Sequence, residues 1–572
     1  MGLPARAPAR LLAGLFVVVG CFAAAWILPA DAHAQLQTTT PEAGAVLTTS
    51  PAHVSATFGE NVEIQFGAVR VYDSNAHRVD NGRSYHPHGD QHSVATDITE
   101  KLPAGGYVVT WRVISADSHP VHGAFTFRVG TGAPTADTEA EAARLLAQGA
   151  GSRSVGIAFG VVRAIGFLAV SLLIGGSLFL VAAWPEGRAE KLPRQLIWVG
   201  WGAALVATLA AIALQGPYGA GLPLSDALKP SVLDAILHTR FGKSYAFRAV
   251  VLVLVVPVVA RLASTKPVTR AWSAVAAVAA AAVLLAPSLS GHSAVGTHVI
   301  AAVPFDVLHQ LGAAVWIGGL ATLFVALAQR RRADELLTIG RAARRFSQWA
   351  LLAVVTIALT GTFAAIREVG LDWDALTTTT YGRLVVAKIV IFVVLIAIAT
   401  SSRRFTHGNL AVPRRRSSPA QAEGHVRLGD LRRAVGMEIV LGVAVFAVTA
   451  ILVNSIPAKT ALALPFSTEV HAGSSLLLDA TMDPAKAGPV ALHLYVLENT
   501  GAQRRVQDVD ATVELPSADI SPIPVHLFRA GPGHFTTPHL DIPIPGEWVL
   551  RTNIRLSKFE EVAADPITVK IR

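Results

Sequence analysis

Residues 107–113 read YVVTWRV, and residues 115–123 read SADSHPVHG. The first stretch alternates and is rich in β-branched and aromatic side chains, which predicts a β-strand. In an extended chain residues i and i+2 share a face, so Asp117 and His119 are predicted to point toward the same place. Pro120 favours extended geometry at His119 and lacks an N–H, which suits a strand end. The sequence therefore predicts a β-domain with a carboxylate and an imidazole side by side at one end.

The start of the chain predicts a cleaved leader. A basic and then apolar stretch covers residues 1–29 and is followed by ADA at residues 30–32, a cleavage site of the A-x-A kind. Cleavage there gives His33 a free α-amine. An amine and an imidazole on one residue form a chelate that suits Cu(II), which favours tetragonal nitrogen and oxygen ligation. His33 is thus a predicted partner of Asp117 and His119 in a Cu(II) site.

Composition predicts a protein that lies mostly in a lipid bilayer. The 572 residues are 52% hydrophobic and only 15% charged, and the mean hydropathy is +0.48, values atypical of a soluble domain. Eight apolar segments are long enough to cross a bilayer as helices. They cover roughly residues 155–184, 195–215, 244–262, 271–289, 303–328, 346–366, 382–400 and 434–453.

Basic residues are distributed unequally among the connecting loops. If the first domain lies outside the cytoplasm, the loops at residues 185–194, 263–270, 329–345 and 401–433 are cytoplasmic, and they hold most of the loop Lys and Arg. This is the positive-inside pattern of a membrane protein. The formal net charge of +9 is therefore explained by topology, and we expect no nucleic-acid partner. The basic loop 401–433 is predicted to be disordered.

The eight segments show matching features that suggest two halves of four helices. The matching pairs are residues 159–166 (FGVVRAIG) and 305–312 (FDVLHQLG), the glycine pairs 175–176 and 318–319, which are shifted by three residues, and residues 239–243 (TRFGK) and 380–383 (TYGR). Four helices per half predict a parallel repeat. Independent convergence on glycine-rich helix packing would give the same pattern.

Four segments of the first domain carry a family pattern. They are HA at residues 33–34, TPEAG at residues 40–44, FGEN at residues 58–61 and WRVISADSHP at residues 111–120, followed by Gly123. They resemble the CopC family of periplasmic copper proteins over residues 33–130. The resemblance implies a small Greek-key β-sandwich that binds Cu(II) through the amine and imidazole of His33, with Asp117 and His119. Glu60 stands where the family has an acidic residue close to the metal, so we expect it to support the ligands.

Two further observations concern metal ligands in this domain. The three methionines of the chain lie outside it, so the methionine-rich Cu(I) site of some family members is not expected. The polar loop at residues 85–92 reads YHPHGDQH. Its histidines, His86, His88 and His92, are interpreted either as a solvated loop or as a second, weaker site for Cu(II) or Zn(II).

Ionisable residues gather around the fifth apolar segment. The preceding loop, GHSAVGTH at residues 291–298, contains His292 and His298. Asp306 and His309 follow at a spacing that places both on one helix face, and ionisable residues at membrane depth tend to be functional.

This region, with residues 380–388 (TYGRLVVAK) and Glu438, resembles the CopD family of copper-transport membrane proteins over residues 155–455. The resemblance implies an inner-membrane protein that takes copper from the first domain. We interpret His292, His298 and His309 as relay ligands, with Asp306 as a proton partner or a support for a ligand. Two alternatives remain, namely histidines that cap helices or are solvated, and a haem ligated by His309.

Residues 461–572 are polar again and alternate, which predicts a β-sandwich of about seven short strands outside the membrane. Segments around His534 and Trp548 resemble the YtkA-like family of extracytoplasmic β-domains. His526, His534 and His539 are either metal contacts or exposed strand-end histidines. The predicted order is a signal peptide at 1–32, a CopC-like domain at 33–130, a linker at 131–154, a CopD-like domain at 155–455 and a YtkA-like domain at 461–572.

The sequence predicts a multi-pass protein of a bacterial cytoplasmic membrane that is not an enzyme. We expect it to bind Cu(II) on the outer side and to pass copper to its helices, with import and homeostasis favoured over resistance. Other extracytoplasmic copper proteins are expected partners. Two alternatives stay open: a copper-supply or assembly scaffold for a respiratory oxidase, and a copper monooxygenase-like enzyme.

Overall fold

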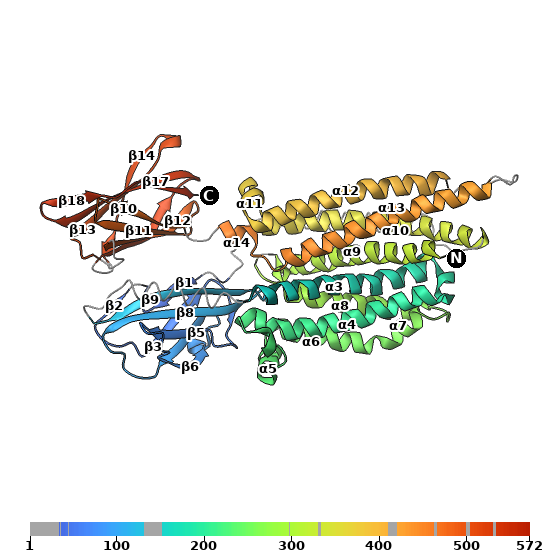
Figure 1. Cartoon of the computed structure of the whole chain (residues 1–572), viewed down its shortest axis with the longest axis horizontal. Helices are drawn as coiled ribbons and strands as arrows, with labels where there is room; N and C mark the ends of the chain where they lie inside the picture. Colours follow the sequence, from blue (N-terminus) through green and yellow to red (C-terminus); the bar gives the residue numbers. More distant parts are fainter. Residues whose placement is uncertain are drawn as a thin grey trace. The chain divides into compact units, whose positions relative to one another are not determined.

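The computed structural model describes residues 34–130 except 35 and 44, residues 152–462 except 297, 330–332 and 410–419, and residues 466–498, 504–529 and 533–571. Ser152–Ser455 forms one compact unit of helices, and the β-strands before and after it in the sequence belong to a second unit. Figure 1 labels these elements along the chain. The predicted sequence of β-domain, helical domain and β-domain is confirmed, while the leader and most of the linker lie outside the described residues.

Two sheets form the first β-domain. One has the order β1 (Leu36–Thr40), β3 (His53–Phe58), β7 (Ser93–Ile98) and β6 (Asp80–Tyr85). The other has the order β2 (Val46–Leu47), β9 (Pro120–Val129), β8 (Gly105–Ser115) and β4 (Val62–Glu63), with β5 (Val69–Asp73) also paired to β8. Phe58 and Trp111, from different sheets, meet edge to face with ring centroids 5.1 Å apart. The alternating strands thus bury one face each, and the expected β-sandwich is confirmed.

Seven described helices are long and apolar enough to cross a membrane. They are α3 (Arg153–Leu178, continued by η2, Phe179–Ala183), α4 (Lys191–Ala220), α8 (Arg270–Leu289), α9 (Val299–Ala328), α10 (Ala333–Glu368), α12 (Thr380–Asn409) and α13 (Ala420–Leu452). The helices α6 (Arg240–Leu254) and α7 (Val256–Leu262) are bent by 49° relative to each other, and together they are long and apolar enough to count as an eighth span if they cross as one. Pro257 explains the bend because it cannot donate the backbone hydrogen bond that would continue α6. The eight predicted segments correspond to these seven helices and the bent α6–α7 pair.

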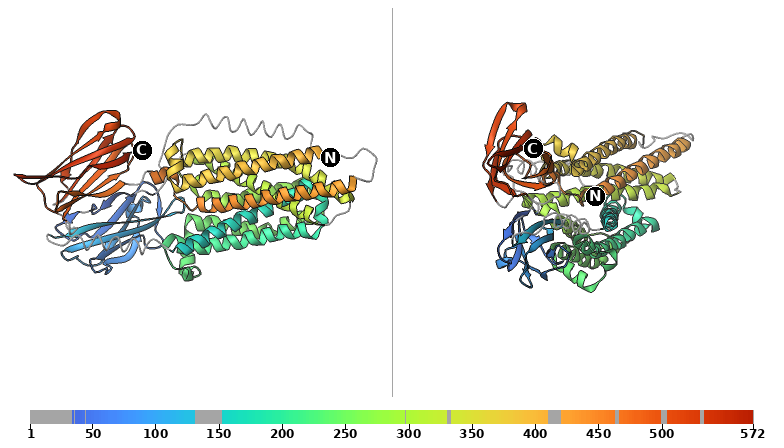
Figure 2. Two further views of the ribbon diagram at one scale, coloured as in Figure 1. Left: turned by 45° about the horizontal axis from the view of Figure 1, so that its top comes forward. Right: turned by 60° about the vertical axis from the view of Figure 1, so that its left-hand side comes forward.

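Short elements connect the long helices, which run alongside one another in both views of Figure 2. They are η3 (Pro185–Ala189), η4 (Leu224–Asp226), α5 (Pro230–His238), η5 (His292–Ala294) and α11 (Trp373–Thr378). A further short helix, α14 (Ala458–Leu462), follows α13 and precedes the C-terminal strands. The prediction of disorder needs correction at residues 401–409 and 420–433, which belong to α12 and α13, while residues 410–419 lie outside the described residues. Residues 420–433 contain two Ala, two Leu and three Arg, which are good helix formers, so the basic charge of this segment did not predict its structure.

Two local features recur in the two halves of the bundle. At the α3–α9 crossing, a Cβ added to Gly175 would lie 2.0 Å from the carbonyl oxygen of Ala314, and one added to Gly318 would lie 1.8 Å from that of Ser171. The two glycines therefore allow the backbones of α3 and α9 to approach closely.

The same repetition occurs where α6 and α12 begin. The Oγ1 of Thr239 accepts from the N–H of Gly242 at 3.0 Å, and the Oγ1 of Thr379 accepts from that of Gly382 at 2.9 Å. The structural equivalent of Thr239 is thus Thr379, one residue earlier than the sequence match suggested, because the N-cap role fixes the alignment.

Two five-stranded sheets form the C-terminal β-domain. One has the order β10 (Phe466–Ala472), β11 (Leu476–Asp483), β12 (Gly488–Glu498), β16 (His534–Ile542) and β15 (Phe528–Arg529). The other has the order β14 (Ile520–Val525), β13 (Asp508–Leu515), β17 (Gly546–Ser557) and β18 (Glu560–Ala563), with β19 (Ile567–Ile571) also paired to β17. The indole of Trp548 is fully buried in its core. The predicted β-rich architecture is confirmed. The domain has ten described strands where about seven were predicted, because short strands such as β15 and β18 give little pattern in the sequence.

Candidate metal centre

Strand pairing brings three distant segments to one end of the first β-domain. Leu36, at the start of β1, pairs with Phe58, at the end of β3. Val62, at the start of β4, pairs with Ser115, at the end of β8. The beginning of β1, residues 59–61 and the β8–β9 connection therefore share one end of the sandwich. This register is why residues more than 80 positions apart in sequence can contribute to one site.

The β8–β9 connection is a tight turn over residues 116–119. The N–H of Ser115 donates to the carbonyl of His119 at 2.9 Å, and the N–H of Ser118 donates to the carbonyl of Ser115 at 2.8 Å. Ser118 has a φ of +71°, a conformation that few non-glycine residues adopt, and it reverses the chain within this turn. Pro120 then begins β9, as its missing N–H predicts.

Asp117 and His119 are brought together, as their spacing predicted. The Oδ1 of Asp117 lies 3.2 Å from the Nδ1 of His119 and accepts from the backbone N–H of His119 at 3.2 Å. The hydroxyl of Ser115 also donates to this oxygen. Asp117 is 1% exposed and His119 is 6% exposed. Because burying a carboxylate is costly unless it is compensated, this carboxylate–imidazole pair is suited to holding a cation through oxygen and nitrogen.

Trp111 and Gly123 fix the strands next to this pair. Gly123 pairs with Trp111 across β8 and β9, and a Cβ at Gly123 would lie 2.4 Å from the indole ring. The absence of a side chain at Gly123 therefore lets the ring lie over the neighbouring strand, where it also contacts Phe58. Packing of the Trp111 ring against the strand therefore explains why residue 123 is a glycine.

Glu60 and His33 were also predicted for this site, and the structure describes only Glu60. Glu60 is half-buried in the bend immediately before β4, at the same end of the sandwich as Asp117. Ala34, just before β1, is 2% exposed, and His33 lies outside the described residues. Asp117 and His119 therefore lie in direct contact, and Glu60 lies at the same end of the domain.

The histidines of the polar loop do not converge. His86 donates from Nδ1 to the carbonyl of Ser93 at 2.9 Å, whereas His92 lies 3.3 Å from the Oδ1 of Asp90. His88 is exposed in η1 (Pro87–Gly89) with a φ of +53°. Among the described residues, these three histidines do not form a group whose ligand atoms approach one another.

In the helical unit, Asp306 is the centre of a polar network. Its Oδ2 accepts from the hydroxyl of Ser288 at 2.7 Å, from the hydroxyl of Ser293 at 3.3 Å and from the amide of Gln310 at 3.0 Å. The amide of Gln310 also donates to Ser288 at 2.9 Å. The network links the end of α8, the short helix η5 and the first half of α9. A carboxylate in such surroundings is a fixed polar site among apolar helices.

His309 has partners of its own on a different helix. Its Nδ1 lies 2.9 Å from the Oγ1 of Thr360 on α10, and a Cβ at Gly361 would lie 3.2 Å from the ring. Lys388 of α12 interacts electrostatically with both His309 and Asp306. Asp306 and His309 thus have separate hydrogen-bond partners, and Lys388 interacts electrostatically with both residues.

The outer-loop histidines occupy distinct positions. His298 is exposed and is the N-cap residue of α9, with a φ of +56°. His292 begins η5; its carbonyl accepts from Arg367 at 3.0 Å, and its ring lies 6.4 Å from that of Tyr381. The side chain of His298 makes no capping hydrogen bond and is exposed. His292 lies in a loop that a hydrogen bond from Arg367 connects to α10.

Sequence reasoning missed the neutral polar partners of the candidate residues. They are Ser115 beside Asp117, Ser288, Ser293 and Gln310 around Asp306, and Thr360 beside His309. A serine or threonine gives little signal in a single sequence. Gln310 was detectable, because it follows Asp306 by four positions on a helix.

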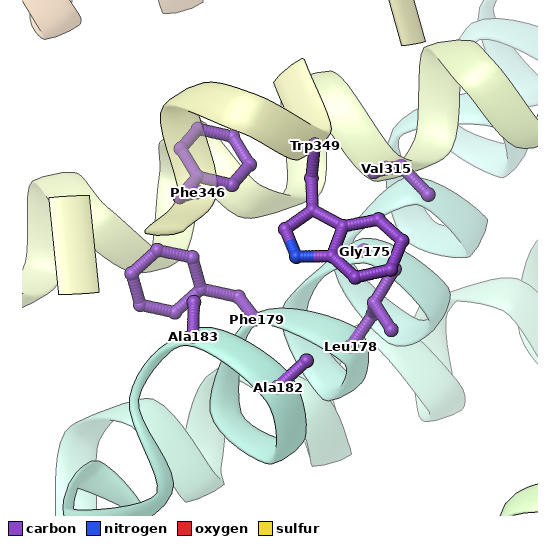
Figure 3. A pocket seen from close by; sticks show the side chains of 8 residues that line it. All are labelled: Gly175, Leu178, Phe179, Ala182, Ala183, Val315, Phe346 and Trp349. Atoms are coloured by element: carbon purple, nitrogen blue, oxygen red, sulfur yellow. The ribbon is translucent and has the colours of Figure 1, made fainter. Parts of the chain in front are cut away.

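Figure 3 shows a small recess between α3, η2, α9 and α10. It is lined by Gly175, Leu178, Phe179, Ala182, Ala183, Val315, Phe346 and Trp349. These side chains include no carboxylate, imidazole, thiol or thioether, so the recess offers no ligand to a metal ion. The chemistry of the helical unit instead concentrates around Asp306 and His309.

Comparison with known proteins follows the same division of the chain. A model of the CopC domain matches residues 36–130, one of the N-terminal domain of copper resistance protein D-like proteins matches residues 154–301, and one of copper resistance protein D matches residues 340–452. Copper resistance protein C of Escherichia coli is 31% identical over 110 residues, which are 18% of this chain and 83% of that protein. The chain belongs to the CopC family. It joins CopC and CopD domains in one polypeptide, as predicted.

Two relatives extend the similarity beyond the CopC domain. Copper transport protein CutJ of Bacillus subtilis (strain 168) is 27% identical over 545 residues, covering 93% of this chain and 94% of that protein. Inner membrane protein YebZ of Escherichia coli (strain K12) is 25% identical over 295 residues, covering 50% of this chain and 96% of that protein. The YtkA-like character of residues 461–572 stays a prediction.

Proposed function

We propose that this protein binds Cu(II) through its CopC domain outside the cytoplasmic membrane and passes copper to its helical domain for import. The names of its relatives, copper transport protein and copper resistance protein, support copper as the cargo. The observation that carries the proposal is the buried Asp117–His119 pair, whose ligand atoms lie 3.2 Å apart at the end of the domain where β1 begins.

The available donors favour Cu(II) over Cu(I). Asp117 offers oxygen, His119 offers nitrogen, and His33 would add an amine and a second imidazole once the leader is removed. Cu(I) prefers soft sulfur ligands, whereas the chain has three methionines outside the CopC domain and one cysteine inside the leader. Glu60 supports the site from the same end of the domain, and the hydroxyl of Ser115 holds Asp117 in place.

In the helical domain, the proposed pathway includes the polar groups around α9. His292 lies in the loop before α9, and Asp306 and His309 follow within it. Asp306 receives three hydrogen bonds from neutral groups, which keep the carboxylate oriented. His298, exposed at the helix start, contributes a ligand at the entrance. The basic loops at the opposite helix ends support an outer position for this entrance.

A binding experiment tests the first step. Cu(II) is titrated into the detergent-solubilised full chain against a competing chelator, and electron paramagnetic resonance reports the ligands. His119→Gln and Asp117→Asn are each expected to weaken the tightest site by at least about tenfold, because each removes one ligand. His77→Gln, which changes an exposed histidine of the same domain, is the matched control. Unchanged affinity in both site variants would remove this pair from the copper site.

A further inference from the structure

Two histidines of the C-terminal β-domain face each other on neighbouring strands. His493 lies within β12 and His534 begins β16. The register pairs His493 with Thr536 and Tyr495 with His534, so the two histidines are diagonal neighbours on the sheet face that points away from the domain core. The Nδ1 of His493 lies 3.1 Å from the Nε2 of His534.

The two rings are held in place by their surroundings. Tyr495 stacks on His534 with centroids 4.2 Å apart and an interplanar angle of 12°. The rings of His493 and His534 are nearly parallel, with an interplanar angle of 21°. His534 is only 3% exposed, whereas His493 is half-buried. Ordered, largely desolvated imidazoles lose little rotational freedom when they bind a ligand.

The separation of the two nitrogens matches that of two ligands on one metal ion. Imidazole nitrogens bind Zn²⁺ at about 2.0–2.1 Å, and in tetrahedral geometry two such nitrogens lie about 3.3 Å apart. At the same bond length, the right angle of a tetragonal Cu(II) site places them about 2.9 Å apart. The observed 3.1 Å lies between these values. A direct histidine–histidine hydrogen bond would give the same distance, so the experiment must separate the two.

We propose that His493 and His534 form a second metal site, which binds a divalent first-row cation through two imidazole nitrogens. Cu(II) is expected to bind more tightly than Zn(II), following the general order of affinities for nitrogen ligands. Two protein ligands leave the other coordination positions to water, so the site is weaker than the Asp117–His119 site and exchanges its ion readily. The site shares no residue with the CopC domain, and it does not depend on the proposed transport function.

The test measures how many Cu(II) ions the full chain binds. The protein is purified in detergent without a histidine tag, dialysed against Cu(II) and a weak chelator, and analysed for bound metal. Wild-type protein is expected to bind one more Cu(II) than His534→Phe, which keeps an aromatic ring beside Tyr495. His493→Gln tests the same ion at a half-buried position that tolerates substitution more easily. His526→Ala and His539→Ala change exposed histidines of the same domain and are expected to retain the ion.

Electron paramagnetic resonance and competition by Zn(II) distinguish a metal site from a direct histidine–histidine hydrogen bond. In a His119→Gln background, the remaining Cu(II) is expected to show nitrogen couplings in electron paramagnetic resonance that disappear with His493→Gln. Zn(II) is expected to compete for this ion, with an affinity lower by about tenfold or more. If the metal content of His534→Phe and His493→Gln equals that of wild type, the pair is a hydrogen-bonded structural contact and the proposal is wrong. That result would leave the CopC-domain site unaffected.

Discussion

At the scale of single residues, two buried aspartates of the CopC domain are stabilised differently. Asp80 accepts from the guanidinium of Arg78 at 2.7 Å and from the backbone N–H groups of Val71 and Gly82 at 2.9 and 2.8 Å. Asp117 accepts from a serine hydroxyl and lies beside an imidazole. A guanidinium is a permanent cation, whereas a neutral imidazole is a metal ligand, so Asp80 has a structural role and Asp117 is suited to binding.

Asp80 gives a prediction about acid stability. Burial alone would raise the pKa of Asp80, but hydrogen bonds from Arg78, Val71 and Gly82 outweigh it and lower the pKa. The unfolded chain therefore takes up this proton more readily, so the stability that the carboxylate contributes is present above a pH of about 4 and is lost below it. We expect Asp80→Asn to destabilise the domain by about 1–3 kcal/mol at neutral pH and to weaken this acid dependence.

Hydrogen–deuterium exchange of β5 and β6 in the full chain, measured across this pH range, checks the prediction. Glu100→Gln changes an exposed carboxylate of the same domain and is the control. A variant at Asp80 with wild-type protection at every pH would show that the Arg78 pair contributes nothing to stability.

At the scale of elements, the α3–α9 crossing determines how closely the two halves of the bundle approach. Gly175 and Gly318 lie at its centre, and each would place a Cβ within 2.0 Å of a backbone oxygen of the other helix. A backbone cannot yield as a flexible side chain does, so any larger residue must separate the helices.

We therefore expect Gly318→Ala to destabilise the bundle by about 1–3 kcal/mol, the usual cost of overpacking. Gly202→Ala on α4 is the matched control, because its added Cβ would meet nothing within 4 Å. Thermal unfolding in detergent, followed by tryptophan fluorescence, measures the difference. Equal midpoints for the two variants would contradict the close crossing.

The elements were largely predictable, and their partners were not. Apolar length predicted the helices, and the YVVTWRV alternation predicted β8, because periodicity is a local property. The Asp117–His119 pair was predictable because i and i+2 share a strand face. Lys388 lies about 80 positions from His309 and Asp306, and its electrostatic interaction with them depends on how α12 packs, which is not a local property of the sequence. The same reason hid the pairing of His493 with His534.

At the scale of the whole molecule, the chain joins a candidate copper-binding β-domain to helices that carry an ordered polar network. In the proposed function these parts act in series, with capture of copper at Asp117 and His119 and passage of copper along α9. Asp306 is the residue that separates the two steps, because it belongs to the helical unit and its partners are Ser288, Ser293 and Gln310.

The most direct measurement is uptake of radioactive copper into right-side-out membrane vesicles that contain the full chain. Wild-type protein is expected to take up copper, whereas Asp306→Asn is expected to reduce uptake by about tenfold or more while Cu(II) binding by the CopC domain is unchanged, because a charged site is lost from the helices. Asp234→Asn, which changes an exposed carboxylate of α5, is expected to retain uptake. Absence of uptake by the wild-type protein would contradict transport and favour a copper-supply scaffold, and full uptake by Asp306→Asn would exclude this network from the pathway.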